Sequence, residues 1–404
     1  MDVLQRFLKY VKIDTPSNSE NDAVWPSSKC QFNLANTLVA ELKEMGVENA
    51  VVDENCYVYA SLPANVENAG AAIGFIAHMD VVEAPKGYGV NPQVTKYSGG
   101  DIALLSGLKI SPNDFPALNN YVGQDIVTSD GTTILGADDK AGVAEIMSLI
   151  KYLTDHPEIK HGKIGVAFTP DEEIGNGATM FNVERFGCDY AYTVDGEEIG
   201  EISYETFNGA AFTFNIKGVN IHPGVAKGKM INAIVLANEI ISQFPATERP
   251  ETTENREGYY FIMDVSGSVE NAKVCGIVRD HDKSEFEKRK QFVNKVYNIM
   301  AEKYPNMVTL EVKDQYYNCA EVIKEHFHLV ENAVAAMKAE GVTPIVMPIR
   351  GGTDGSGLSF KGLPCPNICT GGHNAHGLNE FISVQSMQKV VKILLNLVKA
   401  YAKN

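Results

Sequence analysis

The stretch KIGVAFTPDEEIG (residues 163–175) joins a strand-like apolar run to three consecutive acids, Asp171, Glu172 and Glu173. A short apolar run that ends in polar residues is typical of a buried strand. Three adjacent carboxylates repel one another unless a positive charge lies beside them. The stretch therefore predicts a buried sheet together with a positively charged partner at one of its edges.

Similar strand-like runs alternate with helical patterns over much of the chain. In the first half the strand-like runs are AAIGFIA (71–77), KIGVAFT (163–169) and CDYAYTV (188–194), and AGVAEIMSLIKYL (141–153) has helical period. The alternation resumes after about residue 321, with a helical pattern at 325–341, strand-like runs at 344–349 and 366–372, and a C-terminal helix at 383–402. This order predicts an α/β domain built on a mixed, largely parallel sheet.

A different pattern occupies the segment between these two parts. Its elements are a strand at 210–218, a helix at 230–244, two antiparallel strands within 260–280, a helix at 283–304 and a strand at 308–317. The order β-α-β-β-α-β is that of a separate small α+β domain. The chain is therefore predicted to consist of a catalytic domain (1–206 and 321–404) and an inserted lid domain (207–320).

Composition and charge exclude several classes of protein. The chain has 404 residues, of which 44% are hydrophobic, enough for two cores. Its formal net charge of −16 disfavours nucleic acid and anionic membranes as partners. No apolar run approaches the roughly 20 residues of a membrane span, and the charged N-terminal segment does not resemble a signal peptide. Seven scattered cysteines predict reduced thiols. We therefore expect a cytoplasmic protein.

Histidines and carboxylates follow the strand-like segments of the large domain. They are His78 and Asp80, Asp138 and Asp139, Asp171 to Glu173, Asp195, and His373 and His376. Because the carboxyl ends of strands line the ligand crevice of an open α/β sheet, these side chains are expected to converge. Two histidines mixed with several carboxylates suit zinc, with cobalt or manganese as substitutes, better than magnesium or calcium. Five or six such ligands exceed the needs of one catalytic zinc, which favours two metals sharing a carboxylate.

The adjacent acids Glu172 and Glu173 can take different roles at such a centre. Neighbouring residues at the end of a strand point in different directions, so one carboxylate can bind a metal while the other faces a water molecule. This arrangement supplies a ligand and a general base for hydrolysis. Asp80, two positions after His78, is expected to orient the imidazole by a hydrogen bond.

Each of these signals has a simpler interpretation when taken alone. A single histidine at the end of a strand is more often packed or solvated than a ligand, and three acids in a row often form a solvated loop. The segment GADDKAG (136–142) also fits a tight turn that leads into a helix. The combination of several strand ends favours the metal site over these alternatives.

The motifs HMD (78–80), GADDKAG, TPDEEIG (169–175), VDG (194–196) and NAHG (374–377) together resemble the M20 family of co-catalytic metallopeptidases. The resemblance implies that His78 and Asp195 bind one zinc, that Glu173 and His376 bind the other, and that Asp138 bridges both. It makes Glu172 the general base and Asp80 the residue that orients His78. It also implies a cis peptide bond after Asp138, which leaves Asp139 in a structural role.

The resemblance extends to residues outside the metal ligands. His222 is similar to a family histidine that stabilises the oxyanion of the reaction. Arg279 and Arg350 resemble residues that hold the far end of a short peptide, since a guanidinium group suits a terminal carboxylate. Asn232 is expected to assist with a substrate carbonyl. The alternatives are interdomain salt bridges for the two arginines and helix capping for Asn232.

The resemblance implies a dizinc aminopeptidase that removes the N-terminal residue from tripeptides. The small domain would act as a lid and as the surface of a possible homodimer. Other functions stay open: a carboxypeptidase, dipeptidase or N-acyl amino acid deacylase of the same family, a metal-dependent binding protein, and a two-metal phosphoesterase. The presence of Glu172 disfavours the binding protein, since a site without catalysis has no need of a base.

Overall fold

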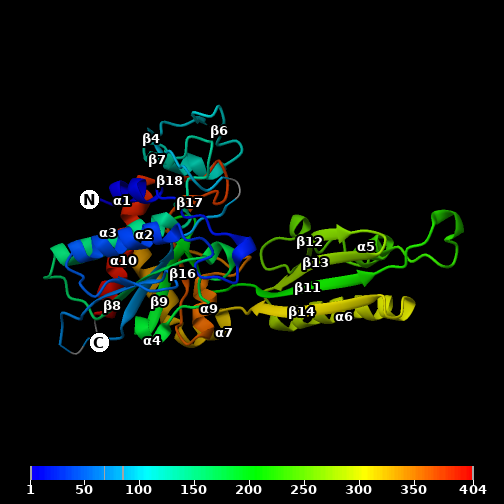
Figure 1. Ribbon diagram of the computed structural model, residues 1–404. Coiled ribbons are helices and arrows are strands. Elements are labelled where there is room, and N and C mark those ends of the chain that lie inside the picture. The colour runs from blue at the N-terminus through cyan, green and yellow to red at the C-terminus, as the bar shows by residue number, and fades with distance from the viewer. Residues whose placement is uncertain (1, 68, 84–85, 403–404) are drawn as a thin grey trace. The chain divides into compact units, whose positions relative to one another are not determined.

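The computed structural model describes residues 2–67, 69–83 and 86–402, and the chain divides into two compact units (Figure 1). The first unit contains residues 2–204, 321–347 and 353–402, and the second contains residues 205–320 and 348–352. The segment 348–352, which carries Arg350, thus belongs to the second unit, whereas the sequence pattern assigned it to the catalytic domain. The reason is that the backbone of this segment is hydrogen-bonded to the second unit. The carbonyl oxygen of Gly351 accepts from the Phe207 N–H, and the Ile349 N–H donates to the carbonyl oxygen of Glu205.

The first unit is built on an eight-stranded sheet with the order β1-β2-β8-β3-β9-β16-β10-β15. The strands are β1 (Val51–Val52), β2 (Val58–Leu62), β3 (Ile73–His78), β8 (Ile164–Thr169), β9 (Tyr190–Gly196), β10 (Glu201–Ser203), β15 (Ile345–Val346) and β16 (Asn367–Cys369). The central strands β8, β3, β9 and β16 are parallel to one another, and antiparallel pairs join them to β2 on one side and to β10 on the other. The predicted mixed, largely parallel sheet is confirmed.

Helices cover both faces of this sheet. The helices of the unit are α1 (Val3–Tyr10), α2 (Gln31–Glu44), α3 (Ala137–Asp155), α4 (Val183–Phe186), α8 (His328–Ala339), α9 (Asp354–Phe360) and α10 (Val384–Tyr401), and the short α7 (Ala320–Ile323) begins at the boundary. Phe75 and Phe168 pack into a core with α1, α2, α3, α8 and α10. Their neighbours Ile76 and Ala167 pack on the opposite face with α4 and α9. Successive strand residues point to opposite faces, so both faces are apolar and the strands read as unbroken hydrophobic runs.

A second, smaller sheet in the first unit does not appear in the sequence pattern. Its order is β17-β18-β7-β4, and all its pairs are antiparallel. The strands are β4 (Gln93–Lys96), β7 (Asp125–Thr128), β17 (Gly372–His373) and β18 (Phe381–Ser383), and a separate hairpin pairs β5 (Ile102–Ala103) with β6 (Lys109–Ile110). Because β17 and β18 flank the segment that carries His376, this sheet fixes both ends of that segment.

The second unit has the predicted β-α-β-β-α-β order. Its elements are β11 (Asn208–Lys217), α5 (Ala233–Ile241), β12 (Tyr259–Gly267), β13 (Asn271–Asp280), α6 (Lys283–Lys303) and β14 (Val308–Tyr316). The strands form an antiparallel sheet of order β12-β13-β11-β14. Alternate residues such as Phe212, Phe214 and Val274 pack with α5 and α6 in a core of their own, while Met263 and Val265 on β12 are exposed.

Among the described residues, no helix is both long enough and apolar enough to cross a membrane.

Candidate metal centre and active site

The predicted metal ligands come from five places in the first unit. His78 ends β3, Asp138 lies in the first turn of α3, and Asp195 lies near the end of β9. Glu173 lies in a short 3-10 helix, η3 (Glu172–Ile174), which follows β8, and His376 lies between β17 and β18. Because β3, β8 and β9 are parallel neighbours, their carboxyl ends meet at one edge of the sheet.

Asp138 lies between the two histidines and faces each with a different oxygen. Its Oδ1 is 2.9 Å from Nε2 of His78, and its Oδ2 is 3.2 Å from Nε2 of His376. The two imidazoles therefore approach the carboxylate from separate sides. This is the arrangement expected of a carboxylate that bridges two cations.

Each histidine has a second carboxylate beside it. Asp195 Oδ1 lies 3.4 Å from Nε2 of His78, and Glu173 Oε2 lies 2.9 Å from Nε2 of His376. The result is two donor sets, each with one imidazole nitrogen, one carboxylate of its own and a share of Asp138. Nitrogen and carboxylate donors suit zinc and its neighbours in the transition series, so the residues present fit two divalent cations.

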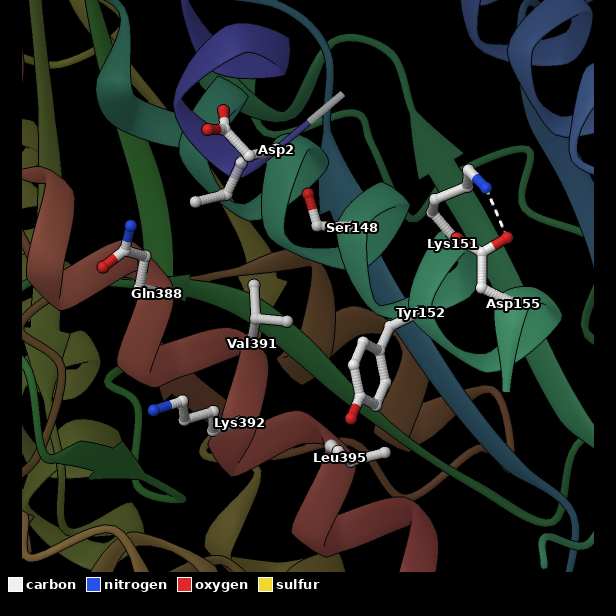
Figure 2. Close-up of a pocket in the computed structure, with 10 residues that line it drawn as sticks. Asp2, Ser148, Lys151, Tyr152, Asp155, Gln388, Val391, Lys392 and Leu395 are labelled. Carbon is white, nitrogen blue, oxygen red and sulfur yellow. Dashed lines mark hydrogen bonds and ion pairs between the residues drawn. The ribbon is translucent and has the colours of Figure 1, made fainter. Parts of the chain in front are cut away.

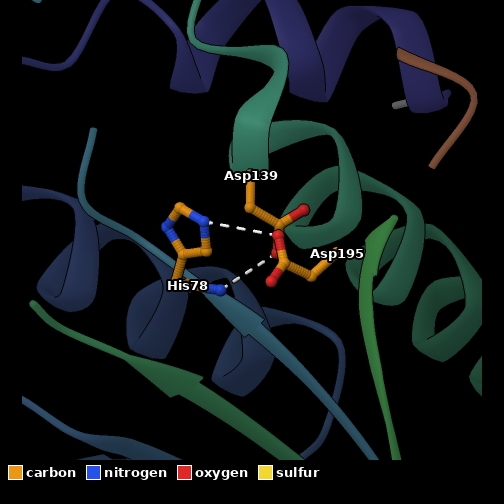
Figure 3. Close-up of side chains that lie close together, drawn as sticks. All are labelled: His78, Asp139 and Asp195. Carbon is orange, nitrogen blue, oxygen red and sulfur yellow. Dashed lines mark hydrogen bonds and ion pairs between the residues drawn. The ribbon is translucent and has the colours of Figure 1, made fainter. Parts of the chain in front are cut away.

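Asp139 lies close to the same atoms but is bonded differently (Figure 3). Its Oδ2 accepts a hydrogen bond of 3.0 Å from the backbone N–H of His78, while the ring of His78 faces Asp195. The side chain is fully buried, and its Oδ1 has no hydrogen-bond partner among the described residues. The peptide bond between Asp138 and Asp139 is cis, as the family resemblance implies. The bond to His78 favours a structural role for Asp139 over a ligand role.

Asp80 connects the His78 strand to the segment that carries Glu172 and Glu173. Its Oδ1 accepts from the Glu172 N–H at 3.0 Å, and its Oδ2 accepts from the Glu173 N–H at 3.2 Å. Nδ1 of His78 lies 3.0 Å from the backbone carbonyl oxygen of Asp80 and 3.4 Å from its Oδ1. The shorter contact to His78 is thus made by the Asp80 backbone, although the side chain was predicted to orient it. Donation from Nδ1 leaves the lone pair of Nε2 free for a metal.

Asp171 holds the other end of the acidic segment. Its carboxylate accepts hydrogen bonds from the Ser27 N–H, the Ser27 hydroxyl and the Gln31 amide at 2.7, 2.5 and 2.6 Å. Its φ of 59° lies in the left-handed region, which non-glycine residues seldom adopt. Asp171 therefore anchors the turn that presents Glu172 and Glu173, and it is not available as a ligand.

Burial and close charges shift the pKa values of these groups in the metal-free protein. Burial raises the pKa of Glu172 well above its usual range and raises that of Glu173 to about 7 and that of Asp195 to about 6. Hydrogen bonds to Asp138 and Glu173 raise the pKa of His376 to about 11. Protons thus balance part of the negative charge, and divalent cations would displace them, as expected when a metal binds to a preformed set of acids.

Comparisons with known proteins agree with this geometry. The model of peptidase family M20/M25/M40 matches residues 131–400. Peptidase T of Alkaliphilus oremlandii (strain OhILAs) is 50% identical over 407 residues, which cover 99% of each chain. The chain belongs to peptidase family M20/M25/M40. It is therefore a hydrolase of peptide bonds, and the resemblance found in its motifs is confirmed.

Two solved structures share the fold of this M20 peptidase. Aminopeptidase PepT from Bacillus cereus ATCC 10987 superposes with a TM-score of 0.78 at 24% identity, covering 99% of this chain and 98% of that one. YXEP of Bacillus subtilis, described as a dinuclear metal-binding peptidase of the M20 family, superposes with a TM-score of 0.64 at 15% identity, covering 98% and 97%. These likenesses confirm the fold class.

His222 and Asn232, two of the predicted substrate-binding residues, are N-caps in the second unit of this peptidase. His222 precedes the 3-10 helix η4 (Pro223–Val225), and its Nδ1 accepts from the Gly224 N–H at 3.1 Å. The proton of the neutral ring therefore lies on Nε2, which is a hydrogen-bond donor. Asn232 caps α5, and its Oδ1 accepts from the Ile234 N–H at 3.0 Å. Asn232 thus caps its helix, as the alternative interpretation of the sequence had it. Its side-chain Nδ2 is still able to donate a hydrogen bond.

Arg279 and Arg350 are both fixed by contacts within the second unit. Arg279 is buried, donates to the backbone carbonyls of Ala210 and Val278, and lies over the ring of Tyr316. Arg350 donates to the backbone carbonyls of Thr253, Asn255 and Glu257 and to the Thr253 hydroxyl, with the rings of Phe207 and Tyr259 beside it. Because all these partners are neutral, the contacts do not offset the positive charge of either guanidinium group. A positive charge of this kind suits the binding of an anion.

Two cavities of the first unit differ in their relation to the metal centre. A small one of about 30 Å³ is lined by Asp138, Asp195, Glu197, His373 and Glu380, among others. A larger one of about 570 Å³ lies among α1, α3 and α10, with Tyr152, Val391 and Leu395 on its wall and the Lys151–Asp155 ion pair at one side (Figure 2). None of the predicted site residues lines the larger cavity, whereas Asp138 and Asp195 line the smaller one.

Asp354 and Glu380 had no role in the sequence interpretation, whereas His373 was predicted to converge with the metal ligands. Asp354 of the GGTDG segment is buried and accepts from the Thr169 hydroxyl at 2.6 Å, and its charge contributes to the raised pKa of Glu172. His373 does not face the metal ligands with its Nε2, which lies 2.6 Å from the Tyr121 hydroxyl. Glu380 contacts the segment before Asp138. Asp354 had a signal in the sequence as an acid within a glycine-rich turn, and His373 had one as a histidine that follows a strand. Glu380 had none, because its partners are more than 200 residues away.

Proposed function

We propose that this M20 peptidase is a dizinc aminopeptidase that removes the N-terminal residue from tripeptides. The observation that carries the proposal is the position of Asp138, with one carboxylate oxygen toward His78 and the other toward His376. In this proposal His78 and Asp195 hold one zinc, Glu173 and His376 hold the other, and Asp138 bridges them. Cobalt or manganese would be accepted by the same donors.

The chemistry of hydrolysis divides between the cations and the residues of the chain. When bound, two divalent cations would lower the pKa of the attacking water and polarise the carbonyl of the scissile bond. Glu172 takes a proton from the attacking water on its carboxylate and delivers it to the nitrogen of the leaving amine. Asp80 and Asp171 hold the turn that presents Glu172, so the base starts from a fixed position.

Residues of the second unit complete the proposal. Nε2–H of His222 would donate to the oxygen that gains negative charge in the transition state. Arg279 and Arg350 would bind the terminal carboxylate of the peptide, and such a clamp would select substrates by their length. Asn232 would donate its side-chain amide to a substrate carbonyl. The unit itself would act as a lid, with a homodimer through its exposed strand face, in a cytoplasmic enzyme.

Support for an aminopeptidase comes from the relatives. The 50% identical relative is named Peptidase T, and a structural neighbour is an aminopeptidase. A carboxypeptidase, dipeptidase or deacylase of the same family would use the same metals but would recognise the other end of the substrate or a blocked amino group.

The test is to offer purified enzyme loaded with zinc or cobalt the tripeptide Met-Gly-Gly, its N-acetylated form and its C-terminal amide. We expect free methionine only from the two peptides with a free amino group, with a lower kcat/KM for the amide than for Met-Gly-Gly. Glu172→Gln is the matched control, since it should keep the metals and lose turnover. Cleavage of the acetylated peptide, or release from the C-terminus, would reject the aminopeptidase in favour of the other branches of the family.

A further inference from the structure

Glu380 is a buried carboxylate whose partners are backbone N–H groups of a distant segment. The residue is 1% exposed. Its Oε2 accepts from the N–H groups of Leu135 and Gly136, each at 2.7 Å, and its Oε1 accepts from the N–H of Asp138 at 3.1 Å. Both oxygens are therefore used, and together they hold the backbone from Leu135 to Asp138.

The segment from Leu135 to Asp138 does not have regular helical backbone geometry. Gly136 has a φ of 74°, and Asp138 and Asp139 have φ and ψ values outside the helical region, although they lie at the start of α3. Helical hydrogen bonds need helical φ and ψ, so they cannot fix the backbone of Asp138. The N–H of Asp138 goes to Glu380 instead.

Glu380 also lies on the segment that carries His376. The two residues are both between β17 and β18, and the Glu380 N–H donates to the carbonyl of Gly377 at 3.1 Å. One short segment thus provides an imidazole on one side of Asp138 and a clamp on its backbone. Since His376 lies 3.2 Å from Oδ2 of Asp138, movement of this segment would shift both groups together.

We propose that Glu380 is a positioning residue that sets Asp138 in the orientation needed to bridge two metal ions. The inference rests on the proposed dizinc function and adds a residue to it that does not touch metal, water or substrate. In the absence of Glu380 the segment 135–138 would be free to turn, and the two oxygens of Asp138 would no longer face both histidines. Partners of metal ligands that act in this way typically change metal affinity by about 10- to 100-fold.

Glu380→Gln is the first variant to test. A glutamine has one acceptor oxygen, so if it keeps the bonds to Leu135 and Gly136, its NH₂ group faces the Asp138 N–H, donor against donor. Glu380→Asp keeps the carboxylate on a shorter side chain and provides a second variant should the first fail to fold. The matched control is Glu41→Gln, because Glu41 is also buried and hydrogen-bonded through both oxygens, to Arg6, Lys9 and Tyr10.

Two measurements separate positioning from general loss of structure. The first is amide hydrogen exchange of the peptide that covers residues 135–138 in the metal-free protein. The second is zinc affinity by competition with a chromogenic chelator, together with the absorption spectrum of the cobalt-loaded protein. We expect both Glu380 variants to exchange faster in this peptide, to bind the second zinc roughly 10- to 100-fold more weakly and to change the cobalt spectrum. Glu41→Gln should leave the zinc affinity and the cobalt spectrum unchanged.

Unchanged zinc affinity in the Glu380 variants would overturn the proposal, whether or not amide exchange rises, because the clamp would then hold a loop without serving the metals. Equal losses of affinity in Glu41→Gln would overturn it as well. A wild-type protein that binds fewer than two zinc ions would instead reject the dizinc function on which the inference rests, and this outcome is visible before any variant is made.

Discussion

At the scale of single residues, neighbours of the same chemical type have different partners. Asp138 faces two imidazoles with its side chain, whereas the next residue, Asp139, accepts a backbone N–H of the His78 strand. Glu173 contacts His376 through its side chain, whereas Glu172 is bonded to Asp80 through its backbone N–H. Burial keeps the protonated form of both glutamates favourable until a cation binds.

Replacing Glu172 or Glu173 by glutamine should therefore have different effects. Glu172→Gln should keep two zinc ions per chain and lower kcat by about 10²- to 10⁴-fold, the usual contribution of a general base. Glu173→Gln should lose one zinc, because an amide replaces the only carboxylate that this donor set does not share. Metal content measured by mass spectrometry after gel filtration distinguishes the two. Equal zinc content in both variants would argue against separate roles.

Glu145 is a buried acid outside the metal centre, and neither of its carboxylate oxygens has a hydrogen-bond partner among the described residues. Burial raises its pKa well above the usual range. Above about pH 4.3 Glu145 loses its proton in the unfolded chain, whereas the folded protein keeps it. The free energy of unfolding therefore falls as the pH rises from this value through the folded pKa of Glu145. Glu145→Met should remove the effect.

We expect Glu145→Met to stabilise the protein by about 1–3 kcal/mol at pH 8, which is the cost of an unsatisfied buried polar group. The gain should shrink toward pH 5, where the acid is protonated in both states to a greater extent. Urea unfolding of the metal-free protein at the two pH values measures it, with Glu145→Gln as a control that keeps the volume and the polarity. If Glu145→Met instead lowers stability, and lowers it more at pH 8 than at pH 5, then Glu145 has a partner when it is ionised.

At the scale of elements, α1 is fixed to α2 by a buried group of charges. Glu41 of α2 accepts from Arg6 and Lys9, both at 2.6 Å, and from the Tyr10 hydroxyl at 2.7 Å. Arg6 and Tyr10 lie on the buried face of α1 with the apolar residues Val3 and Phe7, which pack into the large core. The amphipathic N-terminal helix thus combines apolar packing with one specific ionic contact.

Glu41→Gln should destabilise the first unit by about 3 kcal/mol, because Arg6 would stay buried without its counter-ion. Zinc affinity and kcat should not change, since none of the partners of Glu41 is a metal ligand. Thermal unfolding and peptide hydrolysis at a temperature well below the transition measure the two effects. A variant with normal stability would show that water replaces the carboxylate at Arg6.

The long elements could be predicted from the sequence, and the short non-local ones could not. β3, β8 and α3 have long apolar runs, and the local period of such a run is enough to identify it. The sheet β17-β18-β7-β4 has strands of two to four residues, and it pairs segments from both ends of the first unit, so no local pattern marks it. The same reason explains Glu380: its three bonds reach back 242 to 245 residues. The convergence of histidines and carboxylates at the strand ends was predictable, because the topology of a parallel sheet fixes where its strands end.

At the scale of the whole molecule, the two units have separate cores. The core of the first unit surrounds its large sheet, and that of the second is formed by one face of its sheet with α5 and α6. All five predicted metal ligands belong to the first unit. The free energy of metal binding should therefore act on the folding of the first unit and leave the core of the second unit as it is.

Removal of the metals should thus loosen the first unit alone. Without cations the acids at the ends of β3, β8 and β9 and in the first turn of α3 depend on protons and imidazoles to offset their charges. Amide exchange should therefore rise in peptides from β3, α3 and β9 when zinc is chelated. Zinc at 100 times its dissociation constant stabilises by about 2.7 kcal/mol, so protection in these peptides should change by up to about 100-fold. Peptides from β11, β13 and α6 provide the internal control. The core of the second unit contains no residue of the metal centre. An equal change in its peptides would therefore mean that metal binding is coupled to the second unit as well.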